Sequence, residues 1–175
     1  MISSSDDLTN RLKTFEREAF RLEILDHYEI PSSAENFRAF LAGDPKPEGY
    51  NAGWLDAVRK ATHSGKRMYR VHILSRPLTP YLRYELGWGY LTNMEAGEEF
   101  FILDTTEREN PLADAPDFWL FDEEAPAVMN YDDGGTFLGP TFVPTAQAGD
   151  FVALRDTALA HAVPFTEWWA KHGAE

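Results

Sequence analysis

The sequence of 175 residues contains no cysteine. This absence excludes disulfide bonds, thiolate nucleophiles, zinc fingers and iron–sulfur clusters, and it is typical of proteins from a reducing compartment. The first residues form neither a basic segment nor an apolar one, and no apolar run approaches the ~20 residues that cross a bilayer. We therefore expect a cytoplasmic protein that does not bind membranes.

The common nucleotide-binding and hydrolase motifs are also missing. No Gly-x-x-x-x-Gly-Lys, Gly-x-Gly-x-x-Gly or Gly-x-Ser-x-Gly pattern occurs. The five histidines lie far apart, without His-x-His or His-Glu-x-x-His spacing, so only a site assembled by the fold can bind zinc or iron. From these patterns we predict no cofactor and no metal.

Positive charge is scarce and unevenly placed. The formal net charge is −13, and residues 98–135 carry 12 acidic side chains and one basic side chain, whereas residues 67–97 carry four basic and two acidic ones. Because such a surface repels phosphate groups, direct nucleic-acid binding is not expected, while a basic partner is compatible with it. The acidic segment is either a solvated surface or, with exposed aromatic side chains, a docking surface for a basic protein. The docking candidates are Trp119, Asp122, Glu123 and Tyr131.

Hydrophobic periodicity predicts a single α+β domain over residues 1–175. Apolar residues at helical spacing predict a helical subregion at 1–66, alternation predicts a sheet-forming subregion at 67–143, and a helical pattern returns at 149–172. We expect a helical N-terminal third packed on a mixed, mostly antiparallel sheet of four to five strands and closed by a C-terminal helix.

Local signals place the elements within this plan. Residues 8–22 have helical spacing, although Phe20, Leu22 and Ile24 also alternate as in a strand. The residues expected to start helices are Asp6, Ser32 (in a capping box with Glu35), Asn51, Thr79 and Asp150. Strands are predicted at residues 67–75, 99–103, 117–122, 127–132 and 136–143, the first two parallel and the last at an edge.

A group of polar and aromatic residues extends from the strand at 67–75 through the following helix to the next turn. Its members are Arg70, His72, Tyr81, Arg83, Glu85, Trp88, Asn93 and Glu98. Arg70 and His72 point to the same side of the strand. One interpretation is a pocket for a small polar or anionic ligand, with Arg70 as a guanidinium clamp and Glu98 as a base. The other is a buried structural ion pair of Arg70 with Glu85 or Glu98.

Several short segments carry a resemblance to a known family. They are residues 19–23 with Tyr28, residues 70–75 and 81–85, Asn93, residues 96–98 and residues 117–122. Together they resemble the actinomycete domain-of-unknown-function family numbered 6879, over most of the chain from about residue 15 to Pro164. The resemblance implies a small protein often encoded beside helix-turn-helix regulators, with no established activity.

These observations predict an accessory protein that binds a regulator, such as a helix-turn-helix protein, or a small polar ligand. The alternative is a small biosynthetic enzyme that uses Arg70, Tyr81, Glu85 and Glu98 for acid–base chemistry. An open pocket lined by Arg70 and Glu98 would favour a ligand or substrate site, whereas a sealed pair would argue against one.

Overall fold

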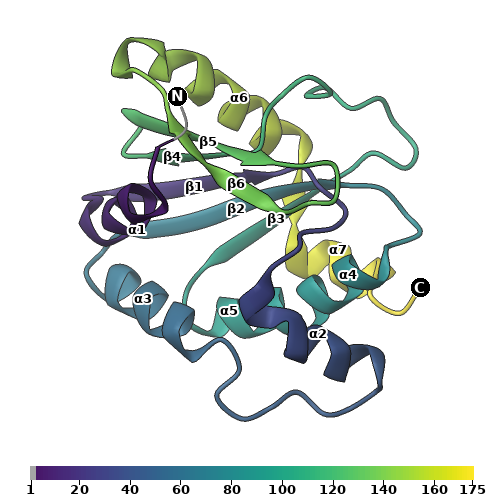
Figure 1. The fold of residues 1–175 in the computed structure, drawn as a ribbon. Helices are drawn as coiled ribbons and strands as arrows, with labels where there is room; N and C mark the ends of the chain where they lie inside the picture. Colours follow the sequence, from purple (N-terminus) through teal and green to yellow (C-terminus); the bar gives the residue numbers. More distant parts are fainter. Residues whose placement is uncertain (1–2) are drawn as a thin grey trace.

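A seven-stranded mixed sheet lies at the centre of the computed structural model, which describes residues 3–175 (Figure 1). Strands β1, β2 and β3 are parallel to one another, and the other neighbouring pairs are antiparallel. The order across the sheet is β6 (Phe137–Phe142), β5 (Ala125–Tyr131), β4 (Phe118–Phe121), β1 (Glu18–Glu23), β2 (Arg67–Leu74), β3 (Glu99–Asp104) and β7 (Val163–Pro164).

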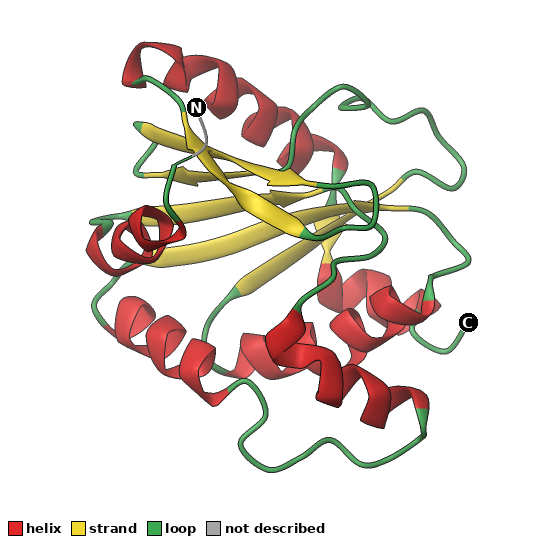
Figure 2. Cartoon of the chain, viewed as in Figure 1, coloured by secondary structure: helices red, strands yellow, loops and turns green. Residues whose placement is uncertain are grey.

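Helices cover both faces of the sheet (Figure 2). The helix α6 (Ala148–His161) packs on one face, here called the α6 side. The opposite face is here called the multi-helix side. Its elements are α1 (Ser5–Thr14), α2 (Ala34–Leu41), which packs on α4, α3 (Ala52–His63), α4 (Pro80–Tyr84), the π-helical η2 (Glu85–Tyr90), α5 (Leu91–Glu95) and α7 (Phe165–His172). Within residues 3–175 no helix has the length and apolarity needed to cross a membrane.

The central strands are buried on both faces, as strands covered by helices on two sides must be. On β1, Phe20 and Leu22 face the α6 side and pack in its apolar core with Val71 of β2. Ala19 of β1 and Met68 of β2 belong to a second apolar core on the multi-helix side. The same side also receives Arg21 and Glu23 of β1 and Arg70 and His72 of β2, which form the polar group described below.

The sheet-forming part of the sequence prediction is confirmed. The strands predicted at 67–75 and 99–103 are β2 and β3, and they pair in parallel. The helix predicted between them is α4, and Thr79 caps it as expected, because its Oγ1 accepts a hydrogen bond from Leu82 N at 3.1 Å. The strands predicted at 117–122 and 127–132 are β4 and β5, which pair antiparallel. The strand predicted at 136–143 is β6, and it lies at the edge of the sheet as expected.

The expectation of a helical N-terminal third, residues 1–66, is wrong. The central strand β1 lies there, between β4 and β2, and the helix α1 ends at Thr14. The sheet also has seven strands rather than four to five. Helical spacing over residues 8–22 was misleading because the apolar residues of α1 and β1 lie three or four residues apart across the end of α1 at Thr14. The alternation of Phe20, Leu22 and Ile24 was the signal of the strand.

Three of the expected helix caps are also corrected. Ser32 does not form the expected capping box with Glu35. It lies in the short 3₁₀ turn η1 (Pro31–Ser33) before α2, and no side chain caps that helix. Asn51 adopts a left-handed conformation and donates from Nδ2 to Asn93 Oδ1 at 2.9 Å instead of capping α3. The helix α6 follows the 3₁₀ turn η3 (Thr145–Gln147) and begins two residues before Asp150.

Candidate functional site

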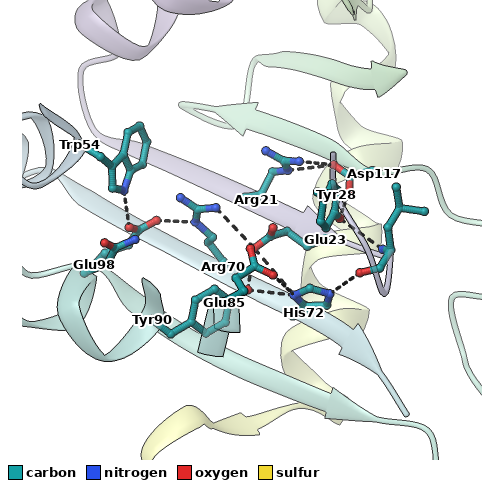
Figure 3. A network of polar contacts seen from close by, with 12 residues as sticks. Arg21, Glu23, Tyr28, Trp54, Arg70, His72, Glu85, Tyr90, Glu98 and Asp117 are labelled. Atoms are coloured by element: carbon teal, nitrogen blue, oxygen red, sulfur yellow. Dashed lines mark hydrogen bonds and ion pairs between the residues drawn. The ribbon is translucent and has the colours of Figure 1, made fainter. Parts of the chain in front are cut away.

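Charged side chains from β1 and β2 meet on the multi-helix side of the sheet (Figure 3). Arg21 and Glu23 of β1 lie directly beside Arg70 and His72 of β2, because the parallel register pairs Arg21 with Arg70 and Glu23 with His72. Residues two apart on a strand point to the same face, so the register alone brings four polar side chains together. Burial of such a group requires compensating partners.

Arg70 and Glu98 form a buried ion pair at one end of this network. Arg70 Nε lies 2.5 Å from Glu98 Oε1, and Trp54 Nε1 donates to Glu98 Oε2 at 2.8 Å. The Glu98 side chain is 0% exposed, whereas that of Arg70 is 13% exposed. Glu98 is therefore sealed, and this pair has the structural role that was one of the two interpretations of the sequence.

Arg21 and Asp117 form a second buried pair at the other end. Arg21 Nε donates to Asp117 Oδ1 at 2.8 Å, and Arg21 Nη2 donates to the Tyr131 hydroxyl at 2.8 Å. Tyr28 donates its hydroxyl hydrogen to Asp117 Oδ2 in a short hydrogen bond. The charge of Arg21 is thus balanced within the protein.

The centre of the network contains Glu23, His72 and Glu85. His72 Nε2 lies 2.9 Å from the Leu25 carbonyl oxygen, which can only accept, so Nε2 carries a hydrogen. His72 Nδ1 faces the Tyr90 hydroxyl at 3.0 Å, Glu85 Oε2 at 3.7 Å and Glu23 Oε1 at 4.0 Å. Tyr90 donates its hydroxyl hydrogen to Glu23 Oε1 at 2.6 Å.

The two central carboxyl groups have opposite pKa shifts. Burial alone raises the pKa of Glu23, but the attraction of Arg70, His72 and Arg21 outweighs it and lowers the pKa to about 2. Burial and the neighbouring charge of Glu23 raise the pKa of Glu85 well above its ordinary value. Glu85 Oε2 is buried and has no hydrogen-bond partner among the described residues. Glu85 is therefore the member of the network whose charge the protein leaves uncompensated.

A pocket of about 300 Å³ leads from the surface to this network. The charged members of the network that line it are Arg21, Glu23, Arg70 and Glu85, here called the pocket floor. The loop after β1 and the strands β5 and β6 supply the walls. The wall residues are Tyr28, Glu29, Ile30, Pro31, Met129, Tyr131 and Phe137.

A larger groove of about 720 Å³ lies between α1 and α3. Its charged lining consists of Lys13, Asp56, Lys60 and Lys66. None of these four side chains belongs to a residue that is buried, and flexible exposed lysines do not hold a ligand in one orientation. The smaller pocket is the better candidate because its floor is fixed by buried partners.

The structure separates the predicted polar group into several places. Arg70, His72 and Glu85 meet at the site. Tyr81 and Trp88 belong instead to an aromatic cluster under α2, and the Tyr81 ring packs at 5.7 Å from that of Phe37. Two further members are also elsewhere: Arg83 is exposed and donates to the Glu175 carbonyl, and Asn93 accepts from Asn51. Glu98 belongs to the network through Arg70, but its side chain is sealed.

The expected docking residues are engaged within the protein. Trp119 is 3% exposed, so the expectation that it presents an exposed ring to a partner is wrong. Asp122 accepts hydrogen bonds from the backbone N–H groups of residues 16–18. Glu123 Oε1 lies 2.8 Å from Arg155 Nη2, and the Tyr131 hydroxyl accepts from Arg21.

Sequence reasoning did not select Arg21, Glu23 or Asp117 as site residues. The signal for the first two is their alternation with Phe20 and Leu22, which indicates a strand with polar side chains on one face. No signal in the sequence links either of them to Asp117.

Comparison with known proteins gives a family and no activity. The family model described as "Domain of unknown function (DUF6879)" matches residues 6–170. No curated protein matches the chain.

Proposed function

The chain belongs to the DUF6879 family, a domain of unknown function, and from the geometry of its pocket we propose that it binds a small cationic ligand. The observation that carries this proposal is the pair of carboxyl groups, Glu23 and Glu85, at the floor of an accessible pocket. One oxygen of Glu85 is buried without a partner, so a cation placed there gains an interaction that the protein itself does not supply.

Charge compensation in the network supports a cation rather than an anion. Two guanidinium groups, Arg21 and Arg70, are set against four carboxyl groups. Arg21 pairs with Asp117 at 2.7 Å, and Arg70 pairs with Glu98. Arg70 Nη1 lies 3.4 Å from Glu23 Oε1, which is a longer contact than either of these pairs has. The proposed guanidinium clamp for an anion is thus already neutralised, whereas Glu85 Oε2 at the floor has no hydrogen-bond partner among residues 3–175.

The walls of the pocket suit a cation that has an apolar body. The rings of Tyr28, Tyr131 and Phe137 line it beside Met129. Aromatic faces attract ammonium and guanidinium groups, and a methionine side chain adapts to the shape of an apolar group. The volume is at the lower end for small-molecule pockets, so the ligand is small.

The alternative of an acid–base enzyme receives less support. It requires Arg70, Tyr81, Glu85 and Glu98 around one substrate, but Glu98 is sealed and Tyr81 is packed among aromatic rings. Binding of a helix-turn-helix regulator stays a prediction from the family resemblance.

The proposal is tested with two fragments of similar shape and opposite charge. Saturation-transfer NMR compares benzylamine with benzoate in the presence of the chelator-treated protein. We expect transfer to benzylamine and none to benzoate. Transfer to benzoate at the same level or above would contradict the proposal.

Two tryptophan substitutions locate the binding. Met129→Trp fills the pocket and should abolish the transfer to benzylamine. Leu138→Trp adds the same side chain at an exposed position of β6 and should leave it unchanged. A thermal melt of each variant confirms that it is folded.

A further inference from the structure

One imidazole nitrogen and two carboxylate oxygens converge at the inner end of the pocket floor. We propose that Glu23, His72 and Glu85 bind a divalent transition-metal ion, of the class of Zn²⁺, Mn²⁺ or Fe²⁺. This inference rests on the proposed function, because the same acidic floor would hold the metal ion in place of the charged group of an organic cation. Its three ligands come from β1, β2 and η2, which are separate in the sequence and brought together by the fold.

The ligand atoms are close to the spacing that a metal requires. One potential ligand atom from each residue lies within 4.8 Å of the other two. His72 Nδ1 is 3.7 Å from Glu85 Oε2 and 4.0 Å from Glu23 Oε1. Ligands at about 2.1 Å from a metal are about 3.0 to 3.4 Å from one another in octahedral or tetrahedral geometry. Small side-chain rotations therefore complete the site.

His72 has the orientation that metal-binding histidines have. Its Nε2–H donates to the Leu25 carbonyl at 2.9 Å, which leaves Nδ1 directed at the Tyr90 hydroxyl, 3.0 Å away, and at the two more distant carboxyl groups. A bound metal would take the place of the hydroxyl contact on Nδ1. A ligating histidine generally donates its other N–H group to a carbonyl or a carboxylate in this way. The Tyr90 hydroxyl, which also lies 3.0 Å from His72 Nδ1, donates to Glu23 Oε1 at 2.6 Å and so orients this carboxylate, as a hydrogen bond to a ligating carboxylate does.

The charge of the site matches a divalent cation. With Arg21 and Arg70 assigned to Asp117 and Glu98, the carboxyl groups of Glu23 and Glu85 remain beside the imidazole of His72. A 2+ ion balances the charges of two carboxylates. It also binds Glu85 Oε2, which has no hydrogen-bond partner among the described residues. The contact of Arg70 with Glu23 at 3.4 Å opposes the ion, but Glu98 holds Arg70 through its Nε.

The mixture of ligand types selects the class of metal. Ca²⁺ and Mg²⁺ prefer oxygen ligands alone, whereas an imidazole with two carboxylates suits Zn²⁺, Mn²⁺ or Fe²⁺. Glu23 and Glu85 also line the pocket, so the metal would keep open positions on that side. Water or an electron-pair donor of a small molecule would occupy them.

Isothermal titration of the chelator-treated full-length protein with ZnCl₂ and MnCl₂ tests the inference. We expect one site, and we expect Glu85→Gln to lower its affinity at least tenfold. The Glu85→Gln side chain keeps the shape of the glutamate, so this variant is expected to fold. His27→Gln is the control, because His27 and Glu29 form an exposed pair at 2.9 Å that could bind a metal adventitiously.

Each outcome has a separate meaning. Equal affinity of the wild type and Glu85→Gln, or loss of binding in His27→Gln, would place the metal elsewhere and overturn the inference. Binding of benzylamine without any binding of Zn²⁺ or Mn²⁺ would overturn the metal site and leave the cationic pocket standing. Failure of both to bind would overturn both proposals. If the metal site is correct, ZnCl₂ should also displace benzylamine.

Discussion

At the scale of single residues, the protein compensates its buried charges with one exception. Glu98 and Asp117 each accept hydrogen bonds from an arginine and from an aromatic side chain. Glu23 accepts from Tyr90 and lies beside Arg70. Among residues 3–175, no group donates a hydrogen bond to Glu85 Oε2. Unsatisfied buried groups in native proteins generally indicate a function, because selection for stability alone would remove them.

Replacement of Glu85 by glutamine should stabilise the metal-free protein. Burial and the charge of Glu23 raise the pKa of Glu85 in the folded state, so the folded state holds its proton to higher pH than the unfolded state does. Wild-type stability therefore falls as the pH rises above about 4.5, by up to about 1.4 kcal/mol per pH unit. Glu85→Gln has no such loss.

Urea denaturation in EDTA at pH 5 and pH 8 measures the difference. The advantage of Glu85→Gln should be larger at pH 8. Glu95→Gln, at an exposed glutamate of α5, should show no advantage at either pH. A Glu85→Gln variant that is less stable than the wild type at pH 8 would contradict the assignment of an uncompensated carboxyl.

Arg70→Gln should destabilise the protein by about 3–5 kcal/mol, because it leaves Glu98 buried and unpaired. The same change at Arg67 is the matched control. Arg67 of β2 pairs with Glu99 at the start of β3, next to Glu98, and their side chains are 45% and 48% exposed. Arg67→Gln should cost less than about 1 kcal/mol. Equal losses of unfolding free energy in urea would refute the structural role of Arg70.

At the scale of elements, the helices and strands that could be predicted are those whose sequence carries one clear pattern. The strand β2 and the helix after it were recognisable from alternation and from Thr79 followed by proline. The strand β1 was not, because Arg21 and Glu23 suggest a solvent-facing surface although both are buried. Their partners lie up to 110 residues away in the sequence, and local patterns carry no information on such distant contacts.

The same limit explains which part of the site was predictable. Arg70, His72 and Glu85 were selected from one strand and the helix that follows it, and they do lie together. Glu98 follows the same helix in the sequence, but its burial beside Trp54 depends on α3. Sequence spacing shows which side chains share an element and a face, but not which neighbour seals them.

The turn between β4 and β5 fixes the start of β1. Asp122 accepts from the N–H groups of Glu16, Arg17 and Glu18 at 2.8, 2.6 and 3.0 Å. Asp122→Ala should lower the free energy of unfolding by about 2 kcal/mol. Its partly buried carboxylate has a lowered pKa because these N–H groups outweigh the effect of burial, so the loss should be largest above pH 4 and shrink in acid.

Urea denaturation at pH 7 and pH 3 provides the measurement. Asp133→Ala, at an exposed position of the next turn, should change stability by less than about 0.5 kcal/mol. A similar cost for both variants would show that the connection to β1 contributes nothing.

The wall of the pocket depends on a close contact at Gly135. This residue has φ +84°, and a Cβ atom there would lie 2.5 Å from the His27 carbonyl oxygen. Gly135→Ala should therefore displace the loop that carries Tyr28, weaken benzylamine binding and cost about 1–3 kcal/mol.

Gly134→Ala is the neighbouring control, because the nearest atom to its added Cβ is Asp132 Oδ1 at 3.4 Å. NMR saturation transfer and thermal melting should distinguish the two variants. Unchanged benzylamine binding in Gly135→Ala would show that the turn at Gly135 does not determine the shape of the pocket.

At the scale of the whole molecule, the acidic excess of residues 98–135 is partly structural. Glu98 and Asp117 neutralise the two arginines of the network, and Asp104 Oδ2 lies 2.7 Å from Arg76 Nε. These carboxylates hold the multi-helix side together instead of facing a partner. The uneven charge of the sequence therefore reflects the interior as well as the surface.

The position of β1 at the middle of the sheet has a consequence for how the chain is made. During synthesis its parallel neighbour β2 emerges about 50 residues later, and its other neighbour β4 about 100 residues later. Until then Arg21 lacks Asp117, and the pocket has neither Met129 nor Tyr131. Contacts between such distant segments fold slowly. A nascent chain that stops before β5 would expose an unpaired apolar strand, so the risk of aggregation is concentrated in the interval before residue 131 is reached.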